Sequence, residues 1–202
     1  MTETVINEAK SRIIKHGRGW CFTPQHFIDL DSDTGVRSAL SRLTKAGVIR
    51  RLAQGIYDYP RENSVLGVLP PKPEDVAKAI ADKNAIQIQP SGAYAANLIG
   101  LSEQIPGRIV FLTNGASKEI KIGNQSILFK TTTEKNMRSA GTKMGLVIQA
   151  VKNIGKDNID PIRQTKIRQF LADTSQHEYL KHLKYAPQWV RALILKIMEK
   201  PL

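Results

Sequence analysis

The chain has 202 residues, 41% of them hydrophobic, which is enough to bury one large core or two small ones. Lysine and arginine number 30 against 18 aspartate and glutamate, and the formal charge of +12 favours a polyanion over an acidic protein as partner. The single cysteine, Cys21, excludes an internal disulfide and a zinc-binding thiolate cluster, and it fits a reducing, cytoplasmic location. No stretch approaches the roughly 20 apolar residues of a membrane-spanning helix, so we expect no membrane partner.

The N-terminal part of the chain begins with two predicted helices. Apolar residues at helical spacing predict the first helix over residues 4–16, and Gly17 supplies its end. After a short β-prone run, Thr23 as N-cap and Pro24 at the first helical position predict a second helix. This second helix is expected to extend through Leu30.

A third helix and a hairpin are predicted next. The helix begins at a cap formed by Ser32 or Asp33 and ends at Gly47. Its apolar residues repeat at i, i+4 and i+7 and form one inward face: Val36, Leu40 and Leu43. Residues 48–52 and 56–59 are β-prone and flank a tight turn, which predicts an antiparallel hairpin.

The chain is predicted to have the α+β fold class, with two domains joined by a linker. Residues 1–60 are predicted to form a winged helix-turn-helix, because three helices followed by a hairpin are the order of elements in that fold. Residues 61–73 are rich in proline and poor in charge, which is typical of a linker. Residues 74–202 are predicted to form an α+β domain with a helical C-terminal layer.

Helices and strands alternate irregularly in the second predicted domain. They are expected as a helix over 74–83, a strand over 85–89, a helix over 91–100, strands over 108–113, 119–122 and 126–130, and helices over 143–153, 161–172, 176–184 and 187–199. Turn signals at Asn114-Gly115 and Gly123-Asn124 separate the strands. They predict a small antiparallel sheet.

The candidate binding residues lie on the third predicted helix and on the hairpin after it. Opposite the apolar face, the helix carries basic and short polar residues: Arg37, Ser38, Ser41, Arg42 and Lys45. In a helix-turn-helix this helix enters the major groove, where arginine binds guanine bidentately, so the first three of these residues are candidates for reading bases. The hairpin adds candidates for contacts to phosphates or the minor groove: Arg50, Arg51 and Gln54.

The alternative explanation of this basic face is an ordinary solvated helix surface. The coincidence of element order, turn positions and a basic hairpin favours DNA binding, because a generic amphipathic helix requires none of them. Tyr57 and Tyr59 are interpreted as packing residues rather than nucleic-acid contacts, since strand tyrosines usually pack. Cys21, between two aromatic residues, is interpreted as a packing residue as well.

Several short segments resemble a known family. The first predicted domain resembles the N-terminal domain of AbiEi-type antitoxins in residues 19–24 (GWCFTP), 39–43 (ALSRL) and 47–57 (GVIRRLAQGIY). The second predicted domain resembles the second domain of an uncharacterised bacterial group classed with these antitoxins. The similar segments are residues 90–97 (PSGAYAAN), 98–101 (LIGL) and 110–115 (VFLTNG). The resemblance covers roughly residues 5–135, and the helical part after Lys143 is less distinctive.

This resemblance implies a transcriptional autorepressor that is also the antitoxin of a type IV toxin–antitoxin, or abortive infection, system. It implies a nucleotidyltransferase toxin that the antitoxin counteracts without having to contact it. We expect double-stranded DNA with an inverted-repeat operator as the partner, bound by two or more copies, because one winged helix covers too little sequence for tight specific binding. We expect no cofactor and no enzymatic activity.

Two alternatives from other classes stay open. An effector-sensing winged-helix transcription factor would need an apolar pocket within residues 74–135. A DNA-acting nuclease would use Glu119 and Lys121 as half of a metal site, but the preceding strand offers no second carboxylate. His177 and His182 resemble a zinc-protease motif only superficially, because a spacing of five places the two rings on different sides of a helix.

Overall fold

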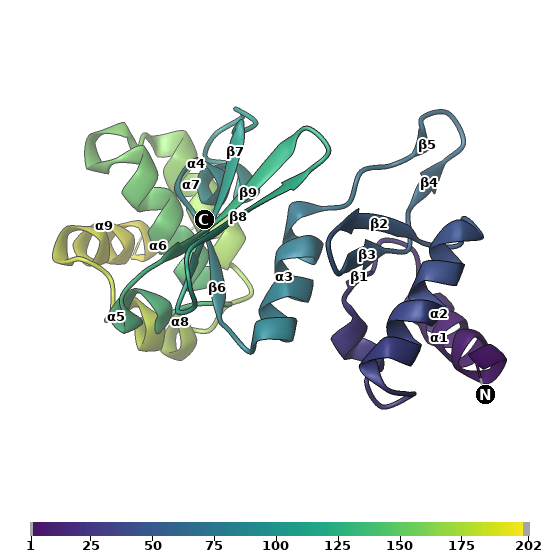
Figure 1. Ribbon diagram of the computed structural model, residues 1–202. Helices are drawn as coiled ribbons and strands as arrows, with labels where there is room; N and C mark the ends of the chain where they lie inside the picture. The colour runs from purple at the N-terminus through teal and green to yellow at the C-terminus, as the bar shows by residue number, and fades with distance from the viewer. Residues whose placement is uncertain (1, 200–202) are drawn as a thin grey trace. The chain divides into compact units, whose positions relative to one another are not determined.

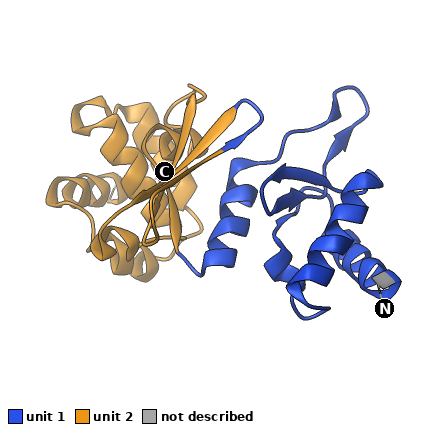
Figure 2. Cartoon of the chain, in the orientation of Figure 1, with its two compact units in different colours: residues 1–86, 121–124 blue, residues 87–120, 125–202 orange. Residues whose placement is uncertain are grey.

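A computed structural model describes residues 2–199 of the chain, which fold into helices and strands of the predicted α+β class (Figure 1). Two compact units are present, residues 1–86 with 121–124 and residues 87–120 with 125–202 (Figure 2). Met1 and residues 200–202, at the outer ends of the two predicted domains, lie outside the described residues. No described helix is both long and apolar enough to cross a lipid bilayer.

The first helix, α1 (Thr2–His16), packs one apolar stripe into the core of the first unit. Ala9 and Ile13, one turn apart, are at most 1% exposed. The helix ends at Gly17, whose φ of 89° lies in the left-handed region and whose N–H donates to the Ile13 carbonyl. The predicted end of this helix is therefore confirmed.

The second predicted helix is wrong in type and length, because the structure has only a 3₁₀ turn, η1 (Pro24–Phe27). The N–H of Thr23 donates to Nδ1 of His26, which opens the turn as a cap. An α-helix through Leu30 would need the His26 carbonyl as an acceptor, but that carbonyl accepts from Arg12 of α1 at 2.7 Å. The Leu30 N–H donates instead to Phe27, in the 3₁₀ pattern.

The third helix, α2 (Asp33–Lys45), begins and ends as predicted. The Ser32 hydroxyl accepts from the Gly35 N–H at 3.2 Å and caps its N-terminus. Gly47 follows it with a φ of 70°. The inward face is fully packed: Val36, Ala39, Leu40 and Leu43 are all at most 3% exposed.

A three-stranded antiparallel sheet completes this core. β2 (Arg50–Ala53) and β3 (Ile56–Asp58) form the predicted hairpin, and β1 (Cys21–Phe22) pairs with the other edge of β3. Phe22 lies opposite Tyr57 in the register, and their rings stack with centroids 6.1 Å apart. The sheet therefore packs with α1 and α2 around one hydrophobic core.

The predicted linker contains secondary structure of its own. β4 (Glu62–Asn63) and β5 (Gly67–Val68) form a short antiparallel hairpin. α3 (Pro73–Asn84), predicted as the start of the second domain, groups with the first unit and packs on β1 and β3 through residues such as Val76 and Ile80. The division between the units thus falls after Ile86 rather than before Glu74.

The second unit contains a four-stranded sheet of order β6-β7-β9-β8. Its strands are β6 (Ile88–Ser91), β7 (Arg108–Thr113), β8 (Lys118–Ile122) and β9 (Gln125–Thr131). The predicted antiparallel sheet is wrong for one pair, because β7 and β9 run parallel, with Phe111 opposite Phe129. Both of these strands bury aromatic and aliphatic residues, whereas β8 is largely exposed and charged and therefore lies at the edge.

Helices fill the rest of the second unit, gathered beside the sheet in Figure 1. They are α4 (Gly92–Leu98), α5 (Glu134–Met137), α6 (Lys143–Ile154), η2 (Lys156–Asn158), α7 (Pro161–Leu171), α8 (Gln176–Leu183) and α9 (Gln188–Met198). α6 is central, because it packs against α4, α7, α8, α9 and β6. The four long C-terminal helices were predicted, whereas the short α5 and η2 were not.

Candidate nucleic-acid interface

The outer face of α2 carries the predicted binding residues together. Five residues of this face are exposed: Arg37, Ser38, Ser41, Arg42 and Lys45. Ala39, Leu40 and Leu43, which alternate with them, are buried in the core. Because the buried face fixes the rotation of the helix, these five side chains are held toward solvent as one set. The structure therefore brings together the helical part of the predicted site.

Arg37 is the one residue of this face with an intramolecular ion pair among the described residues. Its Nε lies 2.6 Å from Oδ2 of Asp33, one turn earlier on α2, and both side chains are more than half exposed. The hydrogen bond to this carboxylate raises the pKa of Arg37. An exposed pair of this kind exchanges readily for another anion, since water screens it.

Arg50 has a different environment from the other predicted residues. Its guanidinium donates twice to the Asp58 carboxylate, at 3.0 and 2.6 Å, and a third time to the Leu69 carbonyl at 3.1 Å. Asp58 is opposite Arg50 in the register of the hairpin and is 1% exposed. Arg50 therefore neutralises a buried carboxylate of the sheet, a role that its sequence position did not reveal.

The remaining predicted residues lie on the exposed side and tip of the hairpin. The Arg51 side chain is exposed, and its Nε makes a long contact of 3.4 Å to the Ala53 carbonyl. Gln54 is exposed at the turn, which Gly55 closes with a φ of 69°. The hairpin thus exposes one cation, Arg51, and one amide, Gln54, fewer groups than the sequence suggested.

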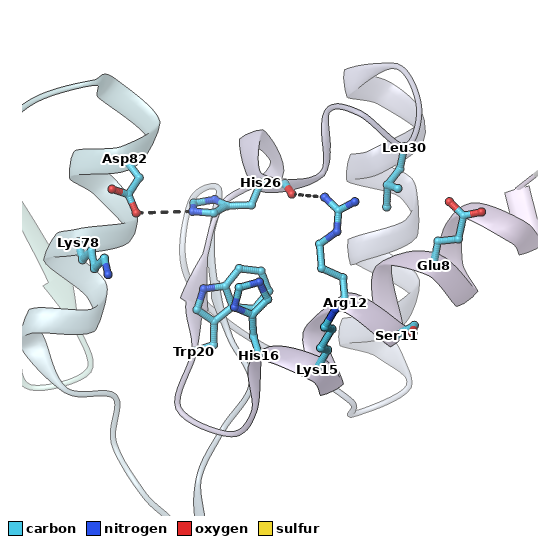
Figure 3. A pocket seen from close by; sticks show the side chains of 10 residues that line it. All are labelled: Glu8, Ser11, Arg12, Lys15, His16, Trp20, His26, Leu30, Lys78 and Asp82. Atoms are coloured by element: carbon cyan, nitrogen blue, oxygen red, sulfur yellow. Dashed lines mark hydrogen bonds and ion pairs between the residues drawn. The ribbon is translucent and has the colours of Figure 1, made fainter.

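A second polar surface of the first unit was missed by sequence reasoning. Lys15 and His16 of α1 face a groove whose opposite side carries Lys78 and Asp82 of α3 (Figure 3). The spacing of basic residues on α1 was visible in the sequence. Nothing in the sequence indicated that α3 would lie across from them.

Cys21 and Glu119, which the sequence offered for packing and for a nuclease site respectively, have ordinary structural environments. Cys21 is 3% exposed, and burial, followed by the nearby Asp58, raises the pKa of its thiol to about 12. Glu119 of β8 is exposed and accepts a hydrogen bond from the Ser126 hydroxyl. Within residues 2–199, no group of three or more His, Cys, Asp or Glu side chains is arranged to hold a metal ion.

A hollow in the second unit is lined by two cations that are already hydrogen-bonded, Arg163 and Lys166. It measures about 520 Å³ and lies beside α7. Arg163 donates to the Leu101 carbonyl and to Asp160, and Lys166 donates to the Gly100 carbonyl at 2.7 Å. These cations fix the loop after α4 and are not available to a ligand without breaking those bonds.

The fold and this surface define a class: an α+β protein of two units, the first of which exposes a basic, polar helix beside an antiparallel hairpin. The chain belongs to a family of unknown function, DUF6088, whose family model matches residues 8–179. No curated protein matches the chain.

Proposed function

We propose that the first unit is a winged helix-turn-helix that binds double-stranded DNA, with α2 as its recognition helix. The observation that carries the proposal is the two-sided character of α2: a fully buried apolar face fixes an exposed set of two arginines, two serines and a lysine. The order α1, β1, η1, α2, β2, β3 and the pairing of β1 with β3 agree with that fold, with η1 in place of its middle helix.

Each exposed residue of α2 has a role in this proposal. Arg37 and Arg42 are suited to bidentate contacts with guanine, and Ser38 and Ser41 to bases or phosphates nearby. Lys45, in the last turn, contacts a phosphate. Asp33 holds Arg37 before binding and releases it when a base or phosphate replaces the carboxylate.

The hairpin contributes a small wing to the same surface. Arg51 and Gln54 reach a phosphate or the minor groove, whereas Arg50 stays with Asp58 and acts through the stability of the hairpin. The formal charge of +12 adds a long-range attraction to DNA that does not depend on sequence. Two copies on an inverted repeat would give the length of contact that specific binding needs.

We further propose that the chain is the autorepressor and antitoxin of a type IV toxin–antitoxin system and acts in the cytoplasm. The support is the resemblance of the first part of the chain to AbiEi-type antitoxins and of the second part to an uncharacterised bacterial group classed with them. The motifs of the second part lie on or beside β6, α4 and β7. The second unit would counter a nucleotidyltransferase toxin without having to contact it. Co-expression with a neighbouring nucleotidyltransferase tests this: restored growth supports antitoxin activity, and unchanged toxicity contradicts it.

DNA binding is tested by a mobility shift of the purified chain on its own upstream DNA and on a scrambled duplex, across a salt series. Specific contacts persist as salt rises, whereas purely electrostatic binding is lost steeply. We expect a retained preference for the upstream DNA at about 0.15 M salt. Equal, salt-sensitive binding to both duplexes would contradict sequence-specific recognition.

A further inference from the structure

A groove of about 960 Å³ lies on the surface of the first unit, between α1 and α3 (Figure 3). This volume is within the range of pockets that hold small organic ligands. All of its lining residues belong to the first unit, and eight of the ten precede α2. It therefore differs from an effector pocket confined to residues 74–135.

Aromatic rings form one wall of the groove. The imidazole of His16 stacks on the indole of Trp20, with ring centroids 3.8 Å apart and planes 13° apart. His26 meets the same indole edge-on at 5.7 Å. His16 is exposed and Trp20 half-buried, so the stack presents a flat ring surface toward the groove.

Two ammonium groups border the groove without partners. Lys15 and Lys78 are exposed, and neither forms a hydrogen bond or ion pair with any residue within 2–199. Two other charged residues of the lining have neighbours: Arg12 bonds to Asp29, and Asp82 lies 3.8 Å from Nε2 of His26. Glu8 lines the end of the groove near Leu30 in Figure 3.

We propose that this groove binds a small organic anion with a flat ring. The ring packs against His16 and Trp20, and a carboxylate or phosphate group of the ligand is bound by Lys15 and Lys78. A nucleoside monophosphate and an aromatic carboxylate share this chemistry. Asp82 lies 3.8 Å from Nε2 of His26, too far for a hydrogen bond, and the two lysines set the preference for an anion.

The groove adjoins the segment that positions α2. Arg12 of α1 donates to the His26 carbonyl of η1, and η1 leads directly into the cap of α2. We infer that a bound anion alters DNA affinity through Arg12 and η1, a step that rests on the proposed function. Linkage then requires DNA to alter the affinity for the anion by the same factor.

The binding test uses the indole as its reporter. Trp189→Phe in the full chain leaves Trp20 as the only tryptophan, and its fluorescence is followed during titration with adenosine monophosphate and, separately, salicylate. We expect saturable quenching by at least one of these two probes. Adenosine and inorganic phosphate, each one half of adenosine monophosphate, should bind about tenfold more weakly or not at all.

Variants separate the site from general charge effects. Lys15→Ala with Lys78→Ala should raise the dissociation constant about tenfold, because it removes both ammonium groups. Lys156→Ala with Lys196→Ala removes the same amount of charge from exposed positions of the second unit and should leave the dissociation constant unchanged. No saturable response to either probe up to about 10 mM, or equal affinity in the two double variants, would overturn the site.

The same titration, repeated with upstream DNA, tests the effector role separately. A change in DNA affinity of about threefold or more at saturating probe, matched by the reciprocal change in probe affinity, supports it. Probe binding with unaltered DNA affinity overturns the effector role and leaves the binding site standing. Failure of DNA binding by itself does not affect the fluorescence result.

Discussion

Arg50 and Asp58 form a two-point ion pair across the β2–β3 hairpin, and the Asp58 carboxylate is almost completely removed from water. A buried carboxylate without its cation is costly, so this pair makes the hairpin depend on the arginine. The hairpin also carries Arg51 and Gln54. Arg50 therefore supports the structure, whereas its neighbour Arg51 is exposed to solvent and makes only a long contact to the Ala53 carbonyl.

Arg50→Ala should lower the free energy of unfolding by about 3 kcal/mol. This value is at the lower end of the range for breaking a buried ion pair, because the guanidinium is a third exposed. Arg51→Ala, whose side chain is exposed, should change it by less than about 0.5 kcal/mol. Urea denaturation of the two variants measures both values. Equal midpoints would show that the Arg50–Asp58 pair does not stabilise the fold.

The Cys21 thiol should be unreactive in the folded protein. With its pKa raised to about 12, the thiolate fraction at pH 8 is about 10⁻⁴, and the sulfur is also buried. A maleimide reagent at pH 8 should label the chain only after unfolding in urea. Rapid stoichiometric labelling of the native chain would contradict the burial of Cys21 in β1.

Asp29 should titrate below its usual range. Hydrogen bonds from Arg12 lower its pKa, so the pair contributes stability above the unfolded value and loses it as pH falls through the folded pKa. Arg12→Ala should raise the Asp29 pKa back toward its ordinary value, as followed by NMR of its carboxyl carbon. An unchanged titration in the variant would mean that Arg12 does not hold Asp29 in solution.

Gly145 of α6 should not tolerate a methyl group. A Cβ there would lie 1.9 Å from the backbone oxygen of Ser139, which cannot move like a side-chain end. Gly145→Ala should cost at least about 2 kcal/mol of stability or prevent folding. Gly107→Ala, where no atom lies within 4 Å of the added carbon, is the matched control. A thermal midpoint of Gly145→Ala equal to that of Gly107→Ala would contradict this close approach.

The sequence predicted best the elements that carry their own periodicity and caps. α2 was predicted from its apolar spacing and from Ser32 and Gly47, signals that lie within the helix or beside it. The length of η1 was not predictable in this way, because Arg12 takes the His26 carbonyl from another helix. Local sequence signals do not predict the length of a helix where a side chain from another element hydrogen-bonds to one of its backbone carbonyls.

The same limit explains the sheet and the candidate sites. β8 and β9 are neighbours in the sheet, as the turn between them predicted. The neighbour of β7 was not predictable from turns, because the buried β9 rather than the exposed β8 pairs with it, and in parallel. The exposed face of α2 followed from the sequence, whereas the partnership of Arg50 with Asp58 depended on hairpin register. The groove required α3 to lie across from α1, a tertiary arrangement that no local pattern indicated.

The most direct test of the central claim compares two double variants for binding to fluorescently labelled upstream DNA at about 0.15 M salt. Arg37→Ala with Arg42→Ala removes two charges from α2, and Arg191→Ala with Lys196→Ala removes two from exposed positions of α9. If α2 is the recognition helix, the first variant should bind about 100-fold more weakly, and the second should stay within about threefold of the unmodified chain. Equal affinities in the two variants, with both folded, would contradict DNA recognition by α2.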